Sequence, residues 1–260
     1  MQPHMITLGG ITIYTYGVLI ALGATLGYFY ISKEAKALGI STVKFDWFCA
    51  GMIISAVLGG RLFFYMTAPD YYFTEPSRLL ENPRTGFVFF GSLLFLLPTA
   101  IWFFRKEQWP IWPLLDSTAI TIPIVHGIGR IGCFFSGCCY GIPTDSVFGV
   151  QFSHPLSNAK PLNVALHPTQ LYEALLIFSI LVLLWQLKKR QKMRGRLIFI
   201  YIGVYGLGRS IIEFFRGDLG RGFIAGGAVS QSQVISVVLI ASALFLFFKF
   251  KTHSTSAPNH

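Results

Sequence analysis

Long apolar runs recur along this chain, separated by short polar or basic segments. A helix needs about 20 mostly apolar residues to cross about 30 Å of hydrocarbon, and the runs have about that length. The pattern therefore predicts an all-α, polytopic membrane protein with seven transmembrane helices, built as one integral-membrane domain over residues 1–260. The predicted spans are Ile11–Ile31, Phe45–Met66, Gly86–Phe104, Trp112–Phe135, Gln170–Leu187, Leu197–Phe215 and Gln233–Phe248.

Basic residues predict how these helices are oriented. Residues 188–196 contain six lysines and arginines in nine positions, and short loops of this kind stay on the cytoplasmic side of a membrane. Placing this loop in the cytoplasm puts the N-terminus outside and the C-terminus inside. Residues 67–85 and 141–169 then form outer loops, and residues 250–260 form a cytoplasmic tail.

The overall composition agrees with a membrane protein. Hydrophobic residues make up 53% of the chain and charged residues only 12%, about half of the roughly 25% that soluble domains carry. This balance excludes a soluble globular domain, a disordered chain and a small disulfide-stapled secreted domain. Because the topology explains the net charge of +10, we expect no nucleic-acid partner.

Four arginines fall inside predicted spans, where a charged side chain is costly and usually functional. In the predicted topology all four lie in the outer half of the membrane. Snorkelling to the outer interface is the alternative interpretation, chiefly for Arg216. The four residues are Arg61, Arg130, Arg209 and Arg216.

The sixth predicted span gathers polar residues on one side. Tyr205, Arg209, Glu213 and Arg216 occupy offsets 0, 4, 8 and 11, which is a stripe about 80° wide on a helix. A stripe of this width cannot face lipid, so we expect it to face the bundle interior or a water-filled cleft. Glu213 is expected to pair with Arg209 or Arg216, and a purely structural ion pair is the alternative.

Two further segments place polar groups at the same outer side. Gln170 and Glu173 share a helix face just after His167, and helix N-termini attract anions; simple capping is the alternative. Residues 126–141 contain five glycines in sixteen positions, which is typical of a broken helix that lines a cavity. A nucleotide-binding loop is excluded, because no strand precedes the glycines and no Lys-Ser/Thr follows them. Together with the arginines, these segments suggest a phospholipid head group as the ligand.

Three motifs are specific enough to identify a family. Residues 129–141 align without gaps with Gly-Arg-x-Gly-Asn-Phe-x-Asn-Gly-Glu-x-x-Gly, and residues 167–173 match His-Pro-Ser-Gln-Leu-Tyr-Glu with threonine for serine. Residues 205–216 match Tyr-Gly-x-x-Arg followed by Glu-Phe-Phe-Arg. The chain resembles the phosphatidylglycerol–prolipoprotein diacylglyceryl transferase family of bacterial inner membranes, from about Tyr16 to Gln233.

The resemblance implies transfer of the diacylglyceryl group from phosphatidylglycerol to the lipobox cysteine thiol of a prolipoprotein, at the outer side of the bacterial inner membrane. A thioether forms and glycerol-1-phosphate is released. We expect a monomer that needs no cofactor and no metal. Catalytic roles are expected for Arg130, Arg209, His126, His167 and Tyr205, with guanidinium groups holding the phosphate. Substrate-binding roles are expected for Arg61, Tyr16, Gly129, Gly141, Gln170, Glu173, Glu213 and Arg216.

The chain departs from the family at positions that bear on the chemistry. Cys133 and Cys138 stand where the signature has asparagine and glutamate, and Phe90 stands where the family has a histidine often assigned as the base. His126 and His167 are the remaining candidates for a base. The alternative functions are therefore a paralogue that moves a group from phosphatidylglycerol to a different acceptor, or a non-catalytic lipid-binding or redox-responsive membrane protein.

Cys133, Cys138 and Cys139 have three interpretations of their own. Zinc binding is disfavoured by the adjacent positions of Cys138 and Cys139. A disulfide between Cys133 and one of the other two would allow redox control. The plainest interpretation is that the three side chains are small apolar fillers beside close-packed glycines.

Overall fold

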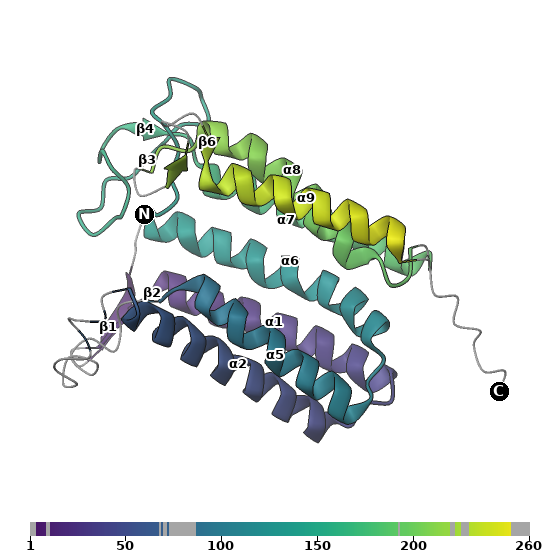
Figure 1. The fold of residues 1–260 in the computed structure, drawn as a ribbon. Coiled ribbons are helices and arrows are strands. Elements are labelled where there is room, and N and C mark those ends of the chain that lie inside the picture. The colour runs from purple at the N-terminus through teal and green to yellow at the C-terminus, as the bar shows by residue number, and fades with distance from the viewer. Residues whose placement is uncertain are drawn as a thin grey trace. The chain divides into compact units, whose positions relative to one another are not determined.

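The computed structural model describes residues 4–8, 11–67, 69, 72, 87–191, 193–218, 222–224 and 229–250. The predicted tail beyond residue 250 and most of the predicted outer loop at 67–85 lie outside these residues. Seven long helices occur in the described part (Figure 1): α1 Thr15–Ala37, α2 Thr42–Tyr65, α5 Phe89–Glu107, α6 Ile111–Ser136, α7 Thr169–Lys189, α8 Leu197–Ile212 and α9 Gln231–Lys249.

The prediction of an all-α polytopic membrane protein is confirmed. A helix occupies most of each predicted span, and six of the described helices are long and apolar enough to cross a membrane. The helix outside those six is α5, whose 19 residues end in Arg105, Lys106 and Glu107. The orientation of the two termini stays a prediction.

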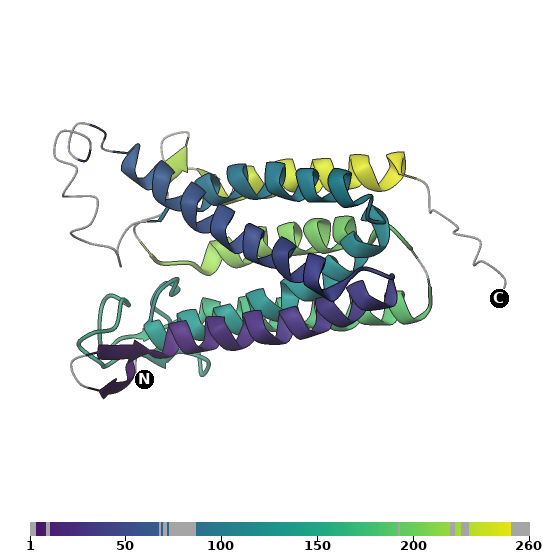
Figure 2. The ribbon, with the colours of Figure 1, turned by 90° about the horizontal axis from the view of Figure 1, so that it is seen from below.

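The first predicted span begins too early. Residues Ile11–Tyr14 form strand β2, which pairs antiparallel with β1 (His4–Leu8) and leads directly into α1, as Figure 2 shows. The β-branched residues of Ile11–Tyr14 favour extended backbone, and a partner strand satisfies their backbone hydrogen bonds. The helix therefore begins at Thr15.

The chain divides into two compact units, which are described separately. One unit contains Met1–Ile31 and Trp112–His260, and the other contains Ser32–Ile111. In the second unit, α2 and α5 pack closely at Gly59 and Gly91, because a Cβ on either glycine would collide with the backbone oxygen of the other. Small residues are what allow such close approach of two membrane helices.

One hydrophobic core cluster of the first unit is built by three helices. It contains Ala119 and Ile120 of α6, Ile180 and Leu184 of α7, and Leu197 and Tyr201 of α8. Figure 1 shows α7, α8 and α9 running side by side, and α8 contacts both neighbours. Short strand pairs flank the helices: β3 Val150–Gln151 with β4 Ala165–Leu166, and β5 Phe223–Ile224 with β6 Val229–Ser230.

A buried carboxylate in α6 caps the start of α8. Asp116 Oδ2 accepts a hydrogen bond from the Gly195 N–H at 2.6 Å, and Oδ1 accepts one from the Leu197 N–H at 3.1 Å. The α8 N-cap residue, Arg196, makes no capping hydrogen bond with its side chain. Asp116 thus satisfies the first amide of α8, which the start of a helix leaves without a partner, and the Gly195 amide just before the helix, and its charge complements the helix dipole.

Candidate functional site

Glu173, near the start of α7, lies at the centre of a buried polar cluster. Its Oε1 accepts a hydrogen bond from the Tyr205 hydroxyl at 2.6 Å and lies 2.9 Å from Arg130 Nη2. Arg209 Nε lies 4.0 Å from the same oxygen. Glu173 is only 1% exposed, so these partners, and not water, compensate its charge. One charge network therefore joins α6, α7 and α8.

His126 orients Arg130 from one helical turn earlier in α6. Arg130 Nε donates a hydrogen bond to His126 Nε2 at 3.3 Å, which leaves the proton of a neutral imidazole on Nδ1, 3.0 Å from the Tyr201 hydroxyl oxygen. The His126 ring also packs edge-on against Tyr205, with centroids 5.1 Å apart. Arg130 Nη1 has no hydrogen bond or ion pair within the described part of the chain. That nitrogen is available to a ligand.

The polar stripe expected on α8 is buried, and its expected ion pair is present. Arg209 Nη1 lies 2.5 Å from Glu213 Oε2, and Arg209 Nη2 donates a hydrogen bond to Ser232 Oγ at 3.4 Å. Arg209 is 8% exposed and Glu213 4%. The ion pair holds the Arg209 side chain close to the Glu173 carboxylate.

The stripe changes direction where α8 ends. Glu213–Phe215 form a single 3-10 turn, η1, and the backbone of Arg216 is extended. Arg216 donates through Nε to Asp218 Oδ1 at 2.8 Å and through Nη2 to Asp218 Oδ2 at 2.5 Å. Such a bidentate ion pair fixes the plane of the guanidinium group.

The start of α7 holds the loop that follows α6. Thr169 Oγ1 donates to the carbonyl oxygen of Cys139 at 2.6 Å, and Gln170 Nε2 donates to that of Cys138 at 2.7 Å. Both side chains are fully buried. Gln170 Oε1 is buried and has no hydrogen-bond partner among the described residues, so it is an acceptor available to a ligand.

Gly141 connects this loop to two other segments, the one just before α7 and the one just after α8. Its N–H donates to the His167 carbonyl oxygen at 2.9 Å, and it forms an isolated β-bridge with Arg216. The imidazole of His167 lies beside this junction, where Nδ1 is 3.0 Å from the Tyr172 hydroxyl oxygen and the ring packs against Phe215.

Replacing Gly141 by alanine should disrupt the junction. A Cβ at this position would lie 2.5 Å from His167 Cβ and 2.6 Å from the carbonyl oxygens of His167 and Phe215. Because backbone atoms cannot move aside cheaply, we expect a loss of about 1–3 kcal/mol of stability and a large loss of activity. Thermal unfolding and an activity assay on the purified variant measure both. The matched control is Gly17→Ala in α1, where a Cβ would contact nothing within 4 Å; equal behaviour of the two variants would contradict the prediction.

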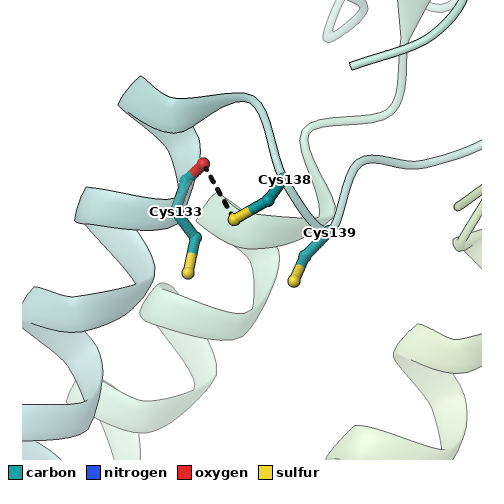
Figure 3. Close-up of side chains that lie close together, drawn as sticks. All are labelled: Cys133, Cys138 and Cys139. Atoms are coloured by element: carbon teal, nitrogen blue, oxygen red, sulfur yellow. Dashed lines mark hydrogen bonds between the residues drawn. The ribbon is translucent and has the colours of Figure 1, made fainter. Parts of the chain in front are cut away.

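Three of the four cysteines come together beside Arg130. Figure 3 shows Cys133 on the last turns of α6 and Cys138 and Cys139 on the following loop, with the three Sγ atoms within 4.8 Å of one another. All four cysteines of the chain are free thiols. Cys138 Sγ donates a hydrogen bond to the Cys133 carbonyl oxygen at 3.7 Å (Figure 3). The neighbouring thiols of Cys133 and Cys138, together with Arg216 and Arg130, lower the pKa of the Cys139 thiol.

Of the remaining predicted residues, Tyr16 lies close enough to Arg130 and the three cysteines to interact with them electrostatically. Tyr16 and Gly129 lie where α1 meets α6: a Cβ on Gly132 would lie 3.1 Å from Tyr16 Cδ2, and a Cβ on Gly129 would lie 3.1 Å from Ile20 Cδ1. Arg61 belongs to α2 and Phe90 to α5 of the other compact unit.

Four polar contacts of the cluster were missed in the sequence. Tyr201 stands four residues before Tyr205, so helical spacing alone would have placed it on the same face. Thr169 is the threonine that replaces serine in a matched motif. Asp218 and Ser232 carry no sequence signal, because they reach Arg216 and Arg209 from outside the helix that bears the arginines.

The family model for prolipoprotein diacylglyceryl transferase matches residues 3–249. A phosphatidylglycerol–prolipoprotein diacylglyceryl transferase of Clostridium tetani is 35% identical, with 95% of this chain and 97% of the relative covered. Transferase 2 of Clostridium perfringens is 31% identical over 92% and 91% of the two chains. The transferase of Halalkalibacterium halodurans is 33% identical over 93% and 83%. The chain therefore belongs to the prolipoprotein diacylglyceryl transferase family.

Proposed function

We propose that this chain transfers the diacylglyceryl group of phosphatidylglycerol to the cysteine thiol of a prolipoprotein. The family match over residues 3–249 is the observation that carries this function. In the reaction, the thiolate sulfur forms a bond to the glycerol carbon that bears the phosphate, and the carbon–oxygen bond breaks. The electron pair of that bond leaves with glycerol-1-phosphate, and the thiol proton passes to a base or to solvent.

The arginines of the Glu173 cluster are the proposed phosphate site. Arg130 Nη1 is available, and a guanidinium group binds phosphate oxygens through charge-assisted hydrogen bonds. Arg209 is held nearby by Glu213. Positioned donors of this kind stabilise the charge that develops on a leaving group. The available Gln170 Oε1 suits a hydroxyl group of the glycerol head group.

His126 is proposed to position Arg130. Its Nε2 lone pair already accepts the hydrogen bond from Arg130 Nε, so the atom that a general base would use is engaged. Tyr205 is proposed to position Glu173, because its hydroxyl donates a hydrogen bond to the Glu173 carboxylate. His167 would act at the junction near Gly141.

The proposed site of action is the outer side of the bacterial inner membrane, and the active form is proposed to be a monomer. The six basic residues of the 188–196 loop support the cytoplasmic placement of that loop. Reporter fusions should place residues 145–160 outside and residues 188–196 inside. Finding both segments on one side of the membrane would contradict the outer location of the site.

The function is tested with the purified protein, phosphatidylglycerol labelled in its diacylglyceryl part, and a synthetic prolipoprotein peptide that carries the lipobox cysteine. We expect label to enter the peptide as a thioether, with one glycerol phosphate released for each thioether formed. A peptide with serine for the cysteine is the control. Consumption of the lipid without thioether would favour a different acceptor, and lipid binding without turnover would favour a non-catalytic protein; either result contradicts the proposal.

A further inference from the structure

The cluster of Cys133, Cys138 and Cys139 has the donor set of a metal centre. The three Sγ atoms lie within 4.8 Å of one another, and each cysteine is partly buried (Figure 3). A tetrahedral zinc ion with Zn–S bonds of about 2.3 Å holds its sulfurs about 3.8 Å apart. Small rotations of the side chains would bring the sulfurs from the observed spacing to that one.

The backbone of the cluster is held in place before any ion binds. Gly137 and Cys139 both have left-handed backbone, with φ of +74° and +60°, and this turns the loop back toward α6. Thr169 and Gln170 hold the carbonyl oxygens of Cys139 and Cys138. The adjacency of Cys138 and Cys139 therefore does not prevent their sulfurs from meeting that of Cys133.

The charges around the cluster suit a metal–thiolate complex. A Zn²⁺ ion with three thiolates carries a net charge of −1, and Arg130 and Arg216 both lie close enough to Cys139 to interact with it electrostatically. The guanidinium groups would stabilise this anionic complex. Asp218 balances part of the Arg216 charge and Glu173 balances part of the Arg130 charge, so the two arginines together supply the counter-charge.

We propose that Cys133, Cys138 and Cys139 bind one Zn²⁺ ion through their thiolates and that the acceptor thiol occupies its fourth position. Within the described residues, the cluster contains three ligands and no fourth, and catalytic zinc sites characteristically combine three protein ligands with one open position. A thiol that coordinates zinc is deprotonated outright. The second half of this inference rests on the proposed function.

This arrangement would supply the activated nucleophile next to the phosphate site. Arg130 and Cys133 are three residues apart in α6, so their side chains lie on the same face with Cβ atoms about 5–6 Å apart. The acceptor thiol would release its proton to solvent on binding zinc. Its sulfur would then form the bond to the glycerol carbon while the carbon–oxygen bond to phosphate breaks, and the thioether product, a weaker ligand, would leave.

The first experiment measures metal content and needs no activity. The protein is purified in detergent under reducing conditions, reconstituted with Zn²⁺ and analysed by elemental analysis and X-ray absorption. We expect one zinc per chain with three sulfur neighbours at about 2.3 Å. Cys133→Ser, Cys138→Ser and Cys139→Ser should each lower the zinc affinity by at least about 100-fold, because even loss of an outer-shell partner costs about 10- to 100-fold.

Cys49→Ser in α2 is the matched control and should retain the zinc. Thermal unfolding of each variant shows whether it is folded, and Co²⁺ binding followed by its thiolate absorption gives a second readout on the wild-type chain. A reconstituted wild-type protein without zinc, or a folded variant lacking all three cysteines that keeps one equivalent, would overturn the site.

The second experiment tests the fourth position separately from turnover. The prolipoprotein peptide is added to the zinc-loaded protein without phosphatidylglycerol. We expect the sulfur count at zinc to rise from three to four with the cysteine peptide and to stay at three with the serine peptide. A count of three with both peptides overturns the role of zinc in binding the acceptor. A count of four without later thioether formation from phosphatidylglycerol leaves the zinc site standing and contradicts the proposed function instead.

Discussion

Replacing Arg130 by alanine is expected to lower the rate of diacylglyceryl transfer by about 10²–10³-fold, the usual loss when one positioned donor is removed from a developing charge. Arg130 offers its Nη1 to a ligand while His126 and Glu173 hold its Nε and Nη2. The initial rate with labelled phosphatidylglycerol and the prolipoprotein peptide measures the effect. Arg130→Lys should recover only part of the rate, since an ammonium group lacks the planar fork of donors.

The control for Arg130 is a basic residue with an ion pair elsewhere in the chain. Lys44 lies 2.5 Å from Glu107, and its side chain is 59% exposed. A surface pair of this kind contributes about 0–1 kcal/mol to stability. The Lys44→Ala variant should therefore catalyse diacylglyceryl transfer at close to the wild-type rate. A wild-type rate in Arg130→Ala would exclude this arginine from phosphate binding.

Replacing Glu173 by alanine is expected to cost about 3–5 kcal/mol of stability, because it removes one partner of a buried charge network. Arg130 and Arg209 would then face each other without the carboxylate between them, and the Tyr205 hydroxyl would lose its acceptor. For a chain of this size we expect the apparent Tm to fall by roughly 10 °C or more. Thermal unfolding in detergent measures the shift.

Two variants distinguish the loss of this network from a general effect of mutation. Glu107→Gln removes the carboxylate of a surface ion pair, whose partner Lys44 is exposed, and should leave the Tm within a few degrees of wild type. The double variant Arg130→Met with Glu173→Met should lose less stability than the two single losses added together, because each side chain no longer leaves the other unpaired. Additive losses would contradict a direct coupling.

The sequence predicted the helices well because a helix that crosses a membrane must be an unbroken apolar run. It was wrong at Ile11–Tyr14, since a short apolar run has the same appearance in a strand and in a helix. The partner that makes it a strand, His4–Leu8, is visible only in the structure.

Part of the polar cluster was also predictable. Helical spacing placed Tyr205, Arg209 and Glu213 on one face, and all three point into the buried network. The position of Glu173 between α6 and α8 depends on how the helices pack, which periodicity does not specify. That the sulfurs of Cys133, Cys138 and Cys139 come within 4.8 Å of one another was not predictable for a similar reason, since the left-handed backbone at Cys139 is not a preference of cysteine.

The cap that Asp116 provides for α8 has a consequence at the opposite end of the same two helices. Arg130 follows Asp116 by 14 residues in α6, and Arg209 follows Leu197 by 12 residues in α8, which at 1.5 Å per residue are distances of about 21 Å and about 18 Å. The Asp116 carboxylate joins α6 to α8 at one level, and each arginine lies a fixed number of helical residues away from that level. The Asp116 contacts therefore fix the positions of the two guanidinium groups relative to each other along the helix axes. If either helix slid along its axis at Asp116, the distances from Glu173 to Arg130 and Arg209 would change.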